Sequence, residues 1–78
     1  MKKAIGQWVG HQIKVRRVDL EMNQGNLAER LGVSQAYLSY LEKGQRQITL
    51  ELLERIASAL QCRMADLLPP DDNRREAA

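Results

Sequence analysis

The chain contains few cysteine, histidine and aromatic residues, which stabilise many small domains through disulfides, metal sites or large core side chains. Its 78 residues include one cysteine and one histidine, so an internal disulfide is excluded and a zinc finger lacks its ligands. Phenylalanine is absent, and the aromatic residues are Trp8, Tyr37 and Tyr40. A core of Leu, Ile, Val, Ala and Met suits packed helices better than a β-sandwich. The sequence therefore predicts one small all-α domain.

Long apolar runs and catalytic groups are equally scarce. No run approaches the roughly 18 apolar residues that span a bilayer. Gln7, Gly10 and Gln12 interrupt the stretch after Lys2 and Lys3, so no signal peptide is predicted. One histidine, no acid pair at a pocket-like spacing and no Gly-rich phosphate loop leave nothing to assemble a catalytic site. We expect no enzyme activity, metal, cofactor, small-molecule ligand or membrane contact, and a cytoplasmic location.

The formal net charge of +2 is unevenly distributed. Residues 1–18 hold five of the twelve bases and no acid, which gives +5, and residues 19–78 hold seven bases and ten acids, which gives −3. A polyanion should therefore meet the N-terminal segment first. A solvated helix face explains such a run equally well, so charge alone does not identify a partner.

Apolar spacing and capping residues predict five helical segments with short connections. The first runs from about Ala4 to Leu20, and its apolar stripe consists of Ile5, Val9, Ile13 and Leu20. The next three begin after the N-cap residues Asn23, Ser34 and Thr49 and end near Leu31, Lys43 and Leu60, and a last short turn covers about residues 64–68. Residues 69–78, which start with two prolines, are predicted to form a flexible tail.

The most informative stretch is residues 24–43, where two short helices are separated by Gly32, Val33 and Ser34. This connection is too tight for an ordinary antiparallel hairpin and suits two helices that cross steeply. Gly32 can adopt the positive φ that the turn requires. Seven positions carry the side chains that such a pair needs, namely Leu27, Ala28, Leu31, Gly32, Val33, Leu38 and Leu41. The pattern predicts a helix-turn-helix.

With these residues the chain resembles the lambda-repressor/Cro-like (XRE-type) helix-turn-helix DNA-binding family. The segments VGHQIKVRR, MNQGNLAERLGVSQAYLSYLEKG and ITLELLERIASALQCRMADLL fall where that five-helix family has its counterparts. The resemblance implies a DNA-binding domain over residues 1–68, with a recognition helix at about 34–43. It also implies a homodimer on double-stranded, palindromic operator DNA, in a bacterial or phage-type nucleoid.

The predicted DNA contacts lie on and around the recognition helix. Its outward face offers amides, hydroxyls and a small apolar group, which suit base edges in the major groove. The predicted base-reading residues are Gln35, Ala36, Ser39 and Tyr40, and the predicted backbone contacts are Gln24, Ser34, Lys43, Gln45, Arg46 and Arg17. The resemblance implies that Gln24 grips a phosphate and braces the recognition helix. It also implies a partly buried ion pair between Arg17 and Glu42.

Some positions depart from the family pattern, and some questions stay open. Glu21 stands where the family favours a glycine, and Gln61 and Cys62 lie where a glycine is usual before the last helix. Trp8, Val15 and Val18 form a second apolar line that packs either on the chain's own C-terminal segment or on another subunit. The predicted function is a small repressor-type transcriptional regulator. The alternative is a helical protein–protein interaction module, antitoxin-like or an adaptor, that does not read DNA.

Overall fold

A computed structural model of the protein describes residues 5–70. Its elements are α1 (Ile5–Asp19), α2 (Gln24–Leu31), α3 (Gln35–Glu42), α4 (Leu50–Ala59) and one turn of 3-10 helix, η1 (Met64–Leu67). Residues 5–70 contain no strand, so the all-α prediction is confirmed. The fifth element is a single 3-10 turn rather than an α-helix. Leu68 precedes a proline and adopts extended dihedral angles, as proline imposes on its predecessor.

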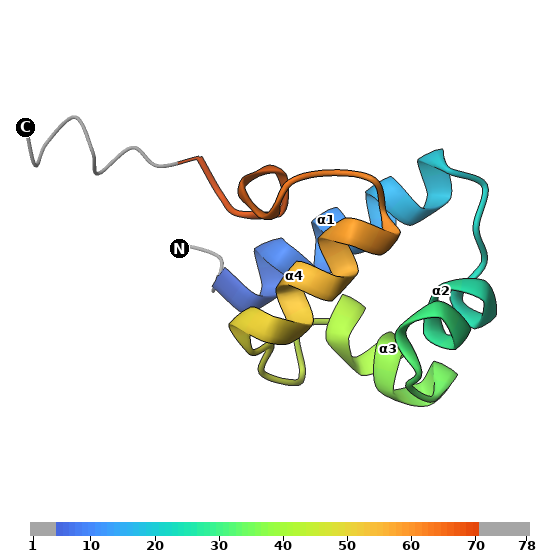
Figure 1. Cartoon of the computed structure of the whole chain (residues 1–78). Coiled ribbons are helices and arrows are strands. Elements are labelled where there is room, and N and C mark those ends of the chain that lie inside the picture. Colours follow the sequence, from blue (N-terminus) through green and yellow to red (C-terminus); the bar gives the residue numbers. More distant parts are fainter. Residues whose placement is uncertain (1–4, 71–78) are drawn as a thin grey trace, which may run out of the picture.

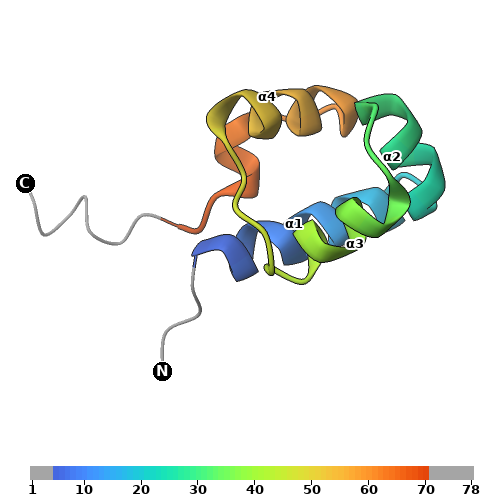
Figure 2. The same ribbon diagram turned by 90° about the horizontal axis from the view of Figure 1, so that it is seen from below.

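The helices enclose one core between the two long helices and the α2–α3 pair. Figures 1 and 2 show α1 running the length of the molecule, with α2 and α3 crossing steeply beside it. Helix α1 packs on α3 and η1, and α4 packs on α2 and η1. The buried apolar side chains come from every element and are Val9, Ile13, Leu27, Ala28, Leu31, Leu38, Leu41, Leu53, Ile56, Ala57, Leu60 and Leu67.

Side-chain caps fix the starts of three helices where the sequence predicted them. The side chain of Asn23 accepts a hydrogen bond from the backbone N–H of Asn26 at 2.7 Å. Ser34 Oγ accepts from Tyr37 N at 3.0 Å, and Thr49 Oγ1 accepts from Leu52 N at 3.1 Å. Each bond satisfies a backbone donor that the helix itself leaves without a partner. The predicted N-caps are therefore confirmed.

The apolar stripe of α1 is shorter than predicted. Val9 and Ile13 are buried, whereas Ile5 is 64% exposed and Leu20 is 39% exposed. The close contact between α1 and α3 lies in the middle of the helix, at Gly10, where an ideal Cβ would lie 2.3 Å from the carbonyl oxygen of Leu41. Helices α1 and α3 thus meet backbone to backbone near Gly10, and α3, with eight residues, is too short to cover both ends of α1.

Two turns close without the glycine that the family pattern favours. Glu21, after α1, and Gln61, after α4, both adopt a φ of 59°. This left-handed conformation costs a residue with a Cβ roughly 1–2 kcal/mol. The turns keep their shape because backbone bonds close them, for example from Met22 N to Arg17 O at 3.0 Å. The absence of glycine at these two helix ends therefore adds backbone strain and leaves the path of the chain unchanged.

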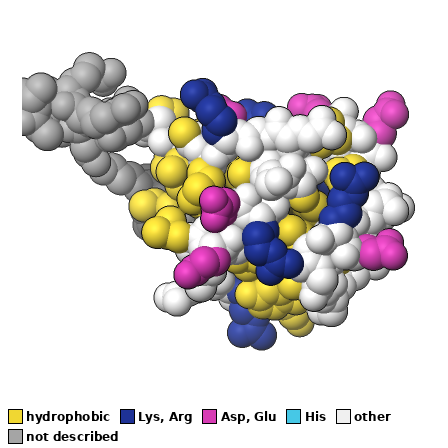
Figure 3. Space-filling view, in the orientation of Figure 1, with side chains coloured by type: hydrophobic (Ala, Val, Ile, Leu, Met, Phe, Trp, Pro, Cys, Tyr) yellow, Lys and Arg dark blue, Asp and Glu magenta, His cyan; other side chains and the backbone are white. Residues whose placement is uncertain are grey.

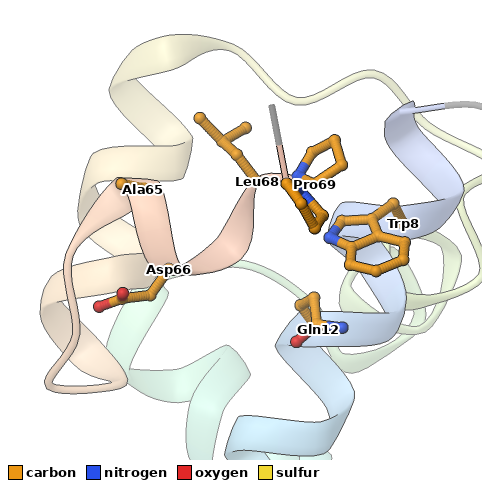
Figure 4. A pocket seen from close by; sticks show the side chains of 7 residues that line it. Trp8, Gln12, Ala65, Asp66, Leu68 and Pro69 are labelled. Carbon is orange, nitrogen blue, oxygen red and sulfur yellow. The ribbon is translucent and has the colours of Figure 1, made fainter. Parts of the chain in front are cut away.

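The second apolar line of α1 divides between two environments. Trp8 borders a hollow of about 460 Å³ whose other side is formed by Ala65, Asp66 and the segment 68–70 (Figure 4). Val15 and Val18, in contrast, are 37% and 54% exposed. Trp8 thus lies against the chain's own C-terminal segment. The predicted start of the first helix at Ala4 and most of the predicted tail lie outside the described residues.

Candidate nucleic-acid interface

Helices α2 and α3 form the predicted helix-turn-helix. The turn between them contains Gly32, with a φ of 71°, and is closed by a bond from Val33 N to Ala28 O of 3.0 Å. The inward side of α3 is buried through Leu38, Leu41 and Glu42. Its other side faces solvent, so the amphipathic pattern fixes which face of α3 is available to a partner.

The predicted base-reading residues lie on that available face. Gln35 and Ala36, in the first turn of α3, are exposed, and Tyr40 is 43% exposed. Ser39 is half-buried. The four residues thus share one accessible side of a helix whose opposite side is locked into the core.

A buried ion pair joins the first helix to the end of α3. Arg17 Nε lies 2.7 Å from Glu42 Oε2, and Arg17 Nη2 donates to Glu42 Oε1 at 3.1 Å. Both residues are only 8% exposed. The ion pair that the resemblance implied is therefore present as a two-point contact. It places a compensating cation against the buried carboxylate of Glu42, on the inward side of α3.

Gln24 completes this network from the start of α2. Its Nε2 donates to Glu42 Oε1 at 3.0 Å, in a part-buried position. The expected bracing of α3 by Gln24 is thus visible as a direct hydrogen bond. The amide nitrogen carries a second hydrogen, which this bond leaves available for a phosphate oxygen.

Burial argues against a second predicted role for Arg17. The sequence placed it among the DNA backbone contacts, but its remaining nitrogen, Nη1, donates to the carbonyl oxygen of Met22 at 2.8 Å. Each of the three guanidinium nitrogens therefore has an acceptor within the chain, and the side chain is only 10% exposed. Nη1 and Nη2 each keep a second hydrogen, so it is burial that speaks against a phosphate contact. The structure shows Arg17 as a residue that positions α3, and its contact with DNA stays a prediction.

The other predicted backbone contacts surround the exposed face of α3. Ser34 caps its start, Lys43 forms its C-terminal cap, and Gln45 and Arg46 follow in the loop, all four exposed. The guanidinium carbon of Arg46 lies 5.3 Å from the centre of the Tyr40 ring. This cation–π contact couples a predicted base reader to a predicted phosphate contact. The sequence missed it because a loop separates the two residues.

Two further positions shape the motif without a signal in the sequence. Arg55, in α4, donates through Nη2 to the carbonyl oxygen of Leu31, so a cation stabilises the C-terminal end of α2. Gly25 lies beside α3, and an ideal Cβ there would be 3.3 Å from Oδ1 of the N-cap residue Asn23 and 3.6 Å from Gln35 Oε1. A side chain at this position would therefore crowd the Asn23 cap and make only an ordinary contact with Gln35.

Three further features of residues 5–70 concern metal ligands, the single cysteine and membrane-spanning helices. Residues 5–70 contain no group of three or more His, Cys, Asp or Glu side chains placed to hold a metal ion. Cys62 is half-buried, and burial raises the pKa of its thiol above the ordinary value. None of the helices in residues 5–70 combines the length and the apolar character needed to cross a membrane.

Comparisons with known proteins agree with this geometry. Residues 13–67 match the family described as helix-turn-helix. An uncharacterized HTH-type transcriptional regulator of Mycobacterium tuberculosis is 41% identical over 51 residues, which are 65% of this chain and 36% of the relative. The chain thus spans about a third of the length of the curated relatives it matches.

Solved structures include both a regulator and part of an enzyme. The clp gene regulator ClgR of Corynebacterium glutamicum superimposes with a TM-score of 0.81 and 32% identity, over 85% of this chain and 86% of that chain. The hydroxypropylphosphonic acid epoxidase of S. wedmorenis gives a TM-score of 0.82 and 30% identity, over 88% of this chain but only 37% of the epoxidase. On the family match and the shared architecture, this chain belongs to the XRE-type helix-turn-helix family.

Proposed function

We propose that the chain is a sequence-specific transcriptional regulator that binds double-stranded DNA and inserts α3 into the major groove. One observation carries this proposal. The outward side of α3 is polar and accessible, while its inward side is fixed by Leu38, Leu41 and the bonds of Glu42 to Arg17 and Gln24. A rigidly held helix with a polar outer face is what major-groove reading requires.

The residues of this face divide by their chemistry. The Gln35 amide suits the N6 and N7 atoms of adenine, and the Ala36 methyl suits the methyl group of thymine. Ser39 and Tyr40 complete the base-reading set as hydroxyl donors. Gln24, Ser34, Lys43, Gln45 and Arg46 are assigned to phosphates, which position the helix without reading sequence.

A homodimer on a palindromic operator is the second part of the proposal. An eight-residue helix covers only a short half-site. Helix-turn-helix dimers bind two half-sites about 34 Å, one helical turn of DNA, apart. The M. tuberculosis relative is named as a regulator and ClgR as a gene regulator, which favours a regulatory role.

The test is a selection of bound duplexes from a random library, repeated with Gln35→Ala. The wild type should enrich one motif with two-fold symmetry. The Gln35→Ala variant should lose preference at one base pair in each half-site, by about 1–3 kcal/mol. Equal weakening on selected and random duplexes would contradict the role of Gln35, and enrichment of no motif would contradict the proposal.

A protein–protein interaction module remains the second candidate, because residues 19–78 carry a formal charge of −3, which does not favour contact with a polyanion. The salt dependence of the affinity for DNA distinguishes the two candidate functions. A regulator loses affinity for DNA steeply as salt rises, because phosphate contacts release counterions. An adaptor should bind any duplex weakly and without a comparable salt dependence.

A further inference from the structure

The two ends of α3 are anchored in different ways. The buried residues of α3 begin at Leu38, and the ion pair and the amide bond described above reach its last residue, Glu42. The first turn, in contrast, exposes Gln35 and Ala36, and its third residue, Tyr37, is half-buried against the core. The position of the first turn therefore depends largely on the connection between α2 and α3.

A side chain from α4 holds this connection from outside the helix-turn-helix. Arg55 donates through Nη2 to the carbonyl oxygen of Leu31, the last residue of α2. A helix leaves its last four carbonyl groups without a partner inside the helix. Backbone N–H groups of the connection bond two of them, at Ala28 and Glu29, and Arg55 bonds a third. Arg55 also lies close to Gly32, where an ideal Cβ would be 3.8 Å from Nη2.

Only three residues separate the bonded carbonyl of Leu31 from Gln35, the first proposed base reader. They are Gly32, Val33 and Ser34. Gly32 has a φ of 71°, the N–H of Val33 bonds a carbonyl oxygen of α2 at 3.0 Å, and Ser34 caps α3. Each of the three is thus fixed by its own conformation or bond. A shift at the Leu31 carbonyl therefore reaches Gln35 through a short stretch of backbone that has little freedom to absorb it.

We infer that Arg55 is a positioning residue for base reading, which fixes the first turn of α3, and with it Gln35 and Ala36, relative to α4. This inference rests on the proposed function. Helices α2 and α4 pack against each other, so the bond ties the connection to a neighbouring helix of the core. A hydrogen bond from a guanidinium group is stronger than one between neutral groups. Arg55 thus does for the start of α3 what Arg17 does for its end.

A direct phosphate contact is the competing role for Arg55, because the residue is exposed. Two acids on the same helix, Glu51 and Glu54, are exposed as well. Figure 3 shows the side of the molecule on which α4 lies in front, and there basic and acidic side chains are interspersed. A surface of mixed charge does not attract a polyanion. The two roles also differ in their effect, since a phosphate contact strengthens binding to every duplex and a positioning residue affects the choice between duplexes.

The test compares Arg55→Gln with Arg30→Gln, which removes the same charge from an exposed position in the last turn of α2 and leaves the bond to Leu31 in place. Glutamine is close to arginine in helix propensity but too short to reach the carbonyl oxygen. The probes are a selected duplex and the same duplex with the base pair that Gln35 reads replaced. The wild type and Arg30→Gln should discriminate equally between the two, and Arg55→Gln should lose about three- to tenfold of this discrimination. In a Gln35→Ala background, Arg55→Gln should cause no further loss at that base pair.

Unchanged discrimination in Arg55→Gln overturns the inference. An equal loss of affinity for both duplexes with a lower salt slope also overturns it and assigns Arg55 to a phosphate. A variant that does not fold overturns it too, because Arg55 is then needed for folding itself.

If no duplex is selected, the proposed function fails on its own. Amide hydrogen exchange of the free proteins then decides whether Arg55 fixes the start of α3. The amides of Val33 and Tyr37, which are bonded in the connection and the N-cap, should exchange faster in Arg55→Gln than in Arg30→Gln, and the amide of Lys43 at the other end should not. Equal rates in the two variants, or faster exchange at all three amides, overturn the inference.

Discussion

Arg17 and Glu42 are 25 residues apart in the sequence, and their side chains meet at two points inside the protein, with Nε to Oε2 at 2.7 Å. Removing one member leaves the other charged and buried without its partner. We therefore expect Arg17→Met to lower the free energy of unfolding by about 3–5 kcal/mol. Urea denaturation measures this loss.

The double variant Arg17→Met/Glu42→Leu is the control for this prediction. It removes both charges and replaces them with apolar groups of similar size, so it should be clearly more stable than Arg17→Met alone. A double variant as unstable as the single one would show that packing, and not the unpaired carboxylate, causes the loss.

Gly10 and Gly6 lie one turn apart in α1 and should respond in opposite directions to the same substitution. Gly10→Ala forces a Cβ to within 2.3 Å of the Leu41 carbonyl oxygen, so it should separate α1 from α3 and cost about 1–3 kcal/mol. Gly6→Ala meets only open space and should stabilise the monomer by about 0.5–1 kcal/mol. Thermal unfolding of both variants checks this, and equal shifts would contradict the close approach at Gly10.

Glycine should relieve the strain at the two left-handed turns. Glu21→Gly and Gln61→Gly each remove a Cβ from a residue with a φ of 59°. Glycine also raises the entropy of the unfolded chain, which offsets part of this relief. Each substitution should therefore raise the free energy of unfolding by about 1 kcal/mol. Glu51→Gly, in the first turn of α4, is the matched control and should destabilise. Chemical denaturation that shows a loss at all three positions would contradict the assigned strain.

Arg46→Ala should weaken binding to every duplex alike. Removing one phosphate contact should lower the slope of log affinity against log salt by about 0.9. The contact between Arg46 and Tyr40 predicts that Tyr40→Ala also reduces this slope, because Arg46 loses the ring that holds it. Titrations at several salt concentrations measure both slopes, and Gln35→Ala is the control, with an unchanged slope. If Tyr40→Ala likewise leaves the slope unchanged, Arg46 does not depend on Tyr40.

Asp66 should make stability depend on pH in the acid range. Its carboxylate accepts the backbone N–H of Arg63 at 2.9 Å, which holds the pKa of Asp66 below its ordinary value. The resulting stability is present above the pKa of the unfolded chain, about 3.9, and is lost as pH falls through the lower pKa of the folded state. Asp66→Ala should therefore be less stable than the wild type at neutral pH, and the two should converge in acid. If the difference in stability between Asp66→Ala and the wild type did not change with pH, the charge of Asp66 would not be its cause.

The sequence predicted best those features that depend on neighbouring residues. The helix starts at Asn23, Ser34 and Thr49 follow from local capping chemistry, and the turn at Gly32 follows from one glycine. The exposure of Ile5 and Leu20 was not predictable from α1 alone, because it depends on the length of the helix that packs against it. The contacts of Tyr40 with Arg46 and of Arg55 with Leu31 depend on the three-dimensional path of a loop and a helix, which periodicity does not encode.

The contacts of α3 determine which of its residues can change without a loss of stability. The side chains of Leu38, Leu41 and Glu42 anchor the helix from its buried side, and Tyr37 packs against the core beside them, whereas Ala36 and Lys43 are exposed. Substitutions on the outward side can therefore accumulate with little penalty in stability. If α3 reads DNA as proposed, a change of a few exposed residues can alter the preferred sequence while the scaffold stays the same.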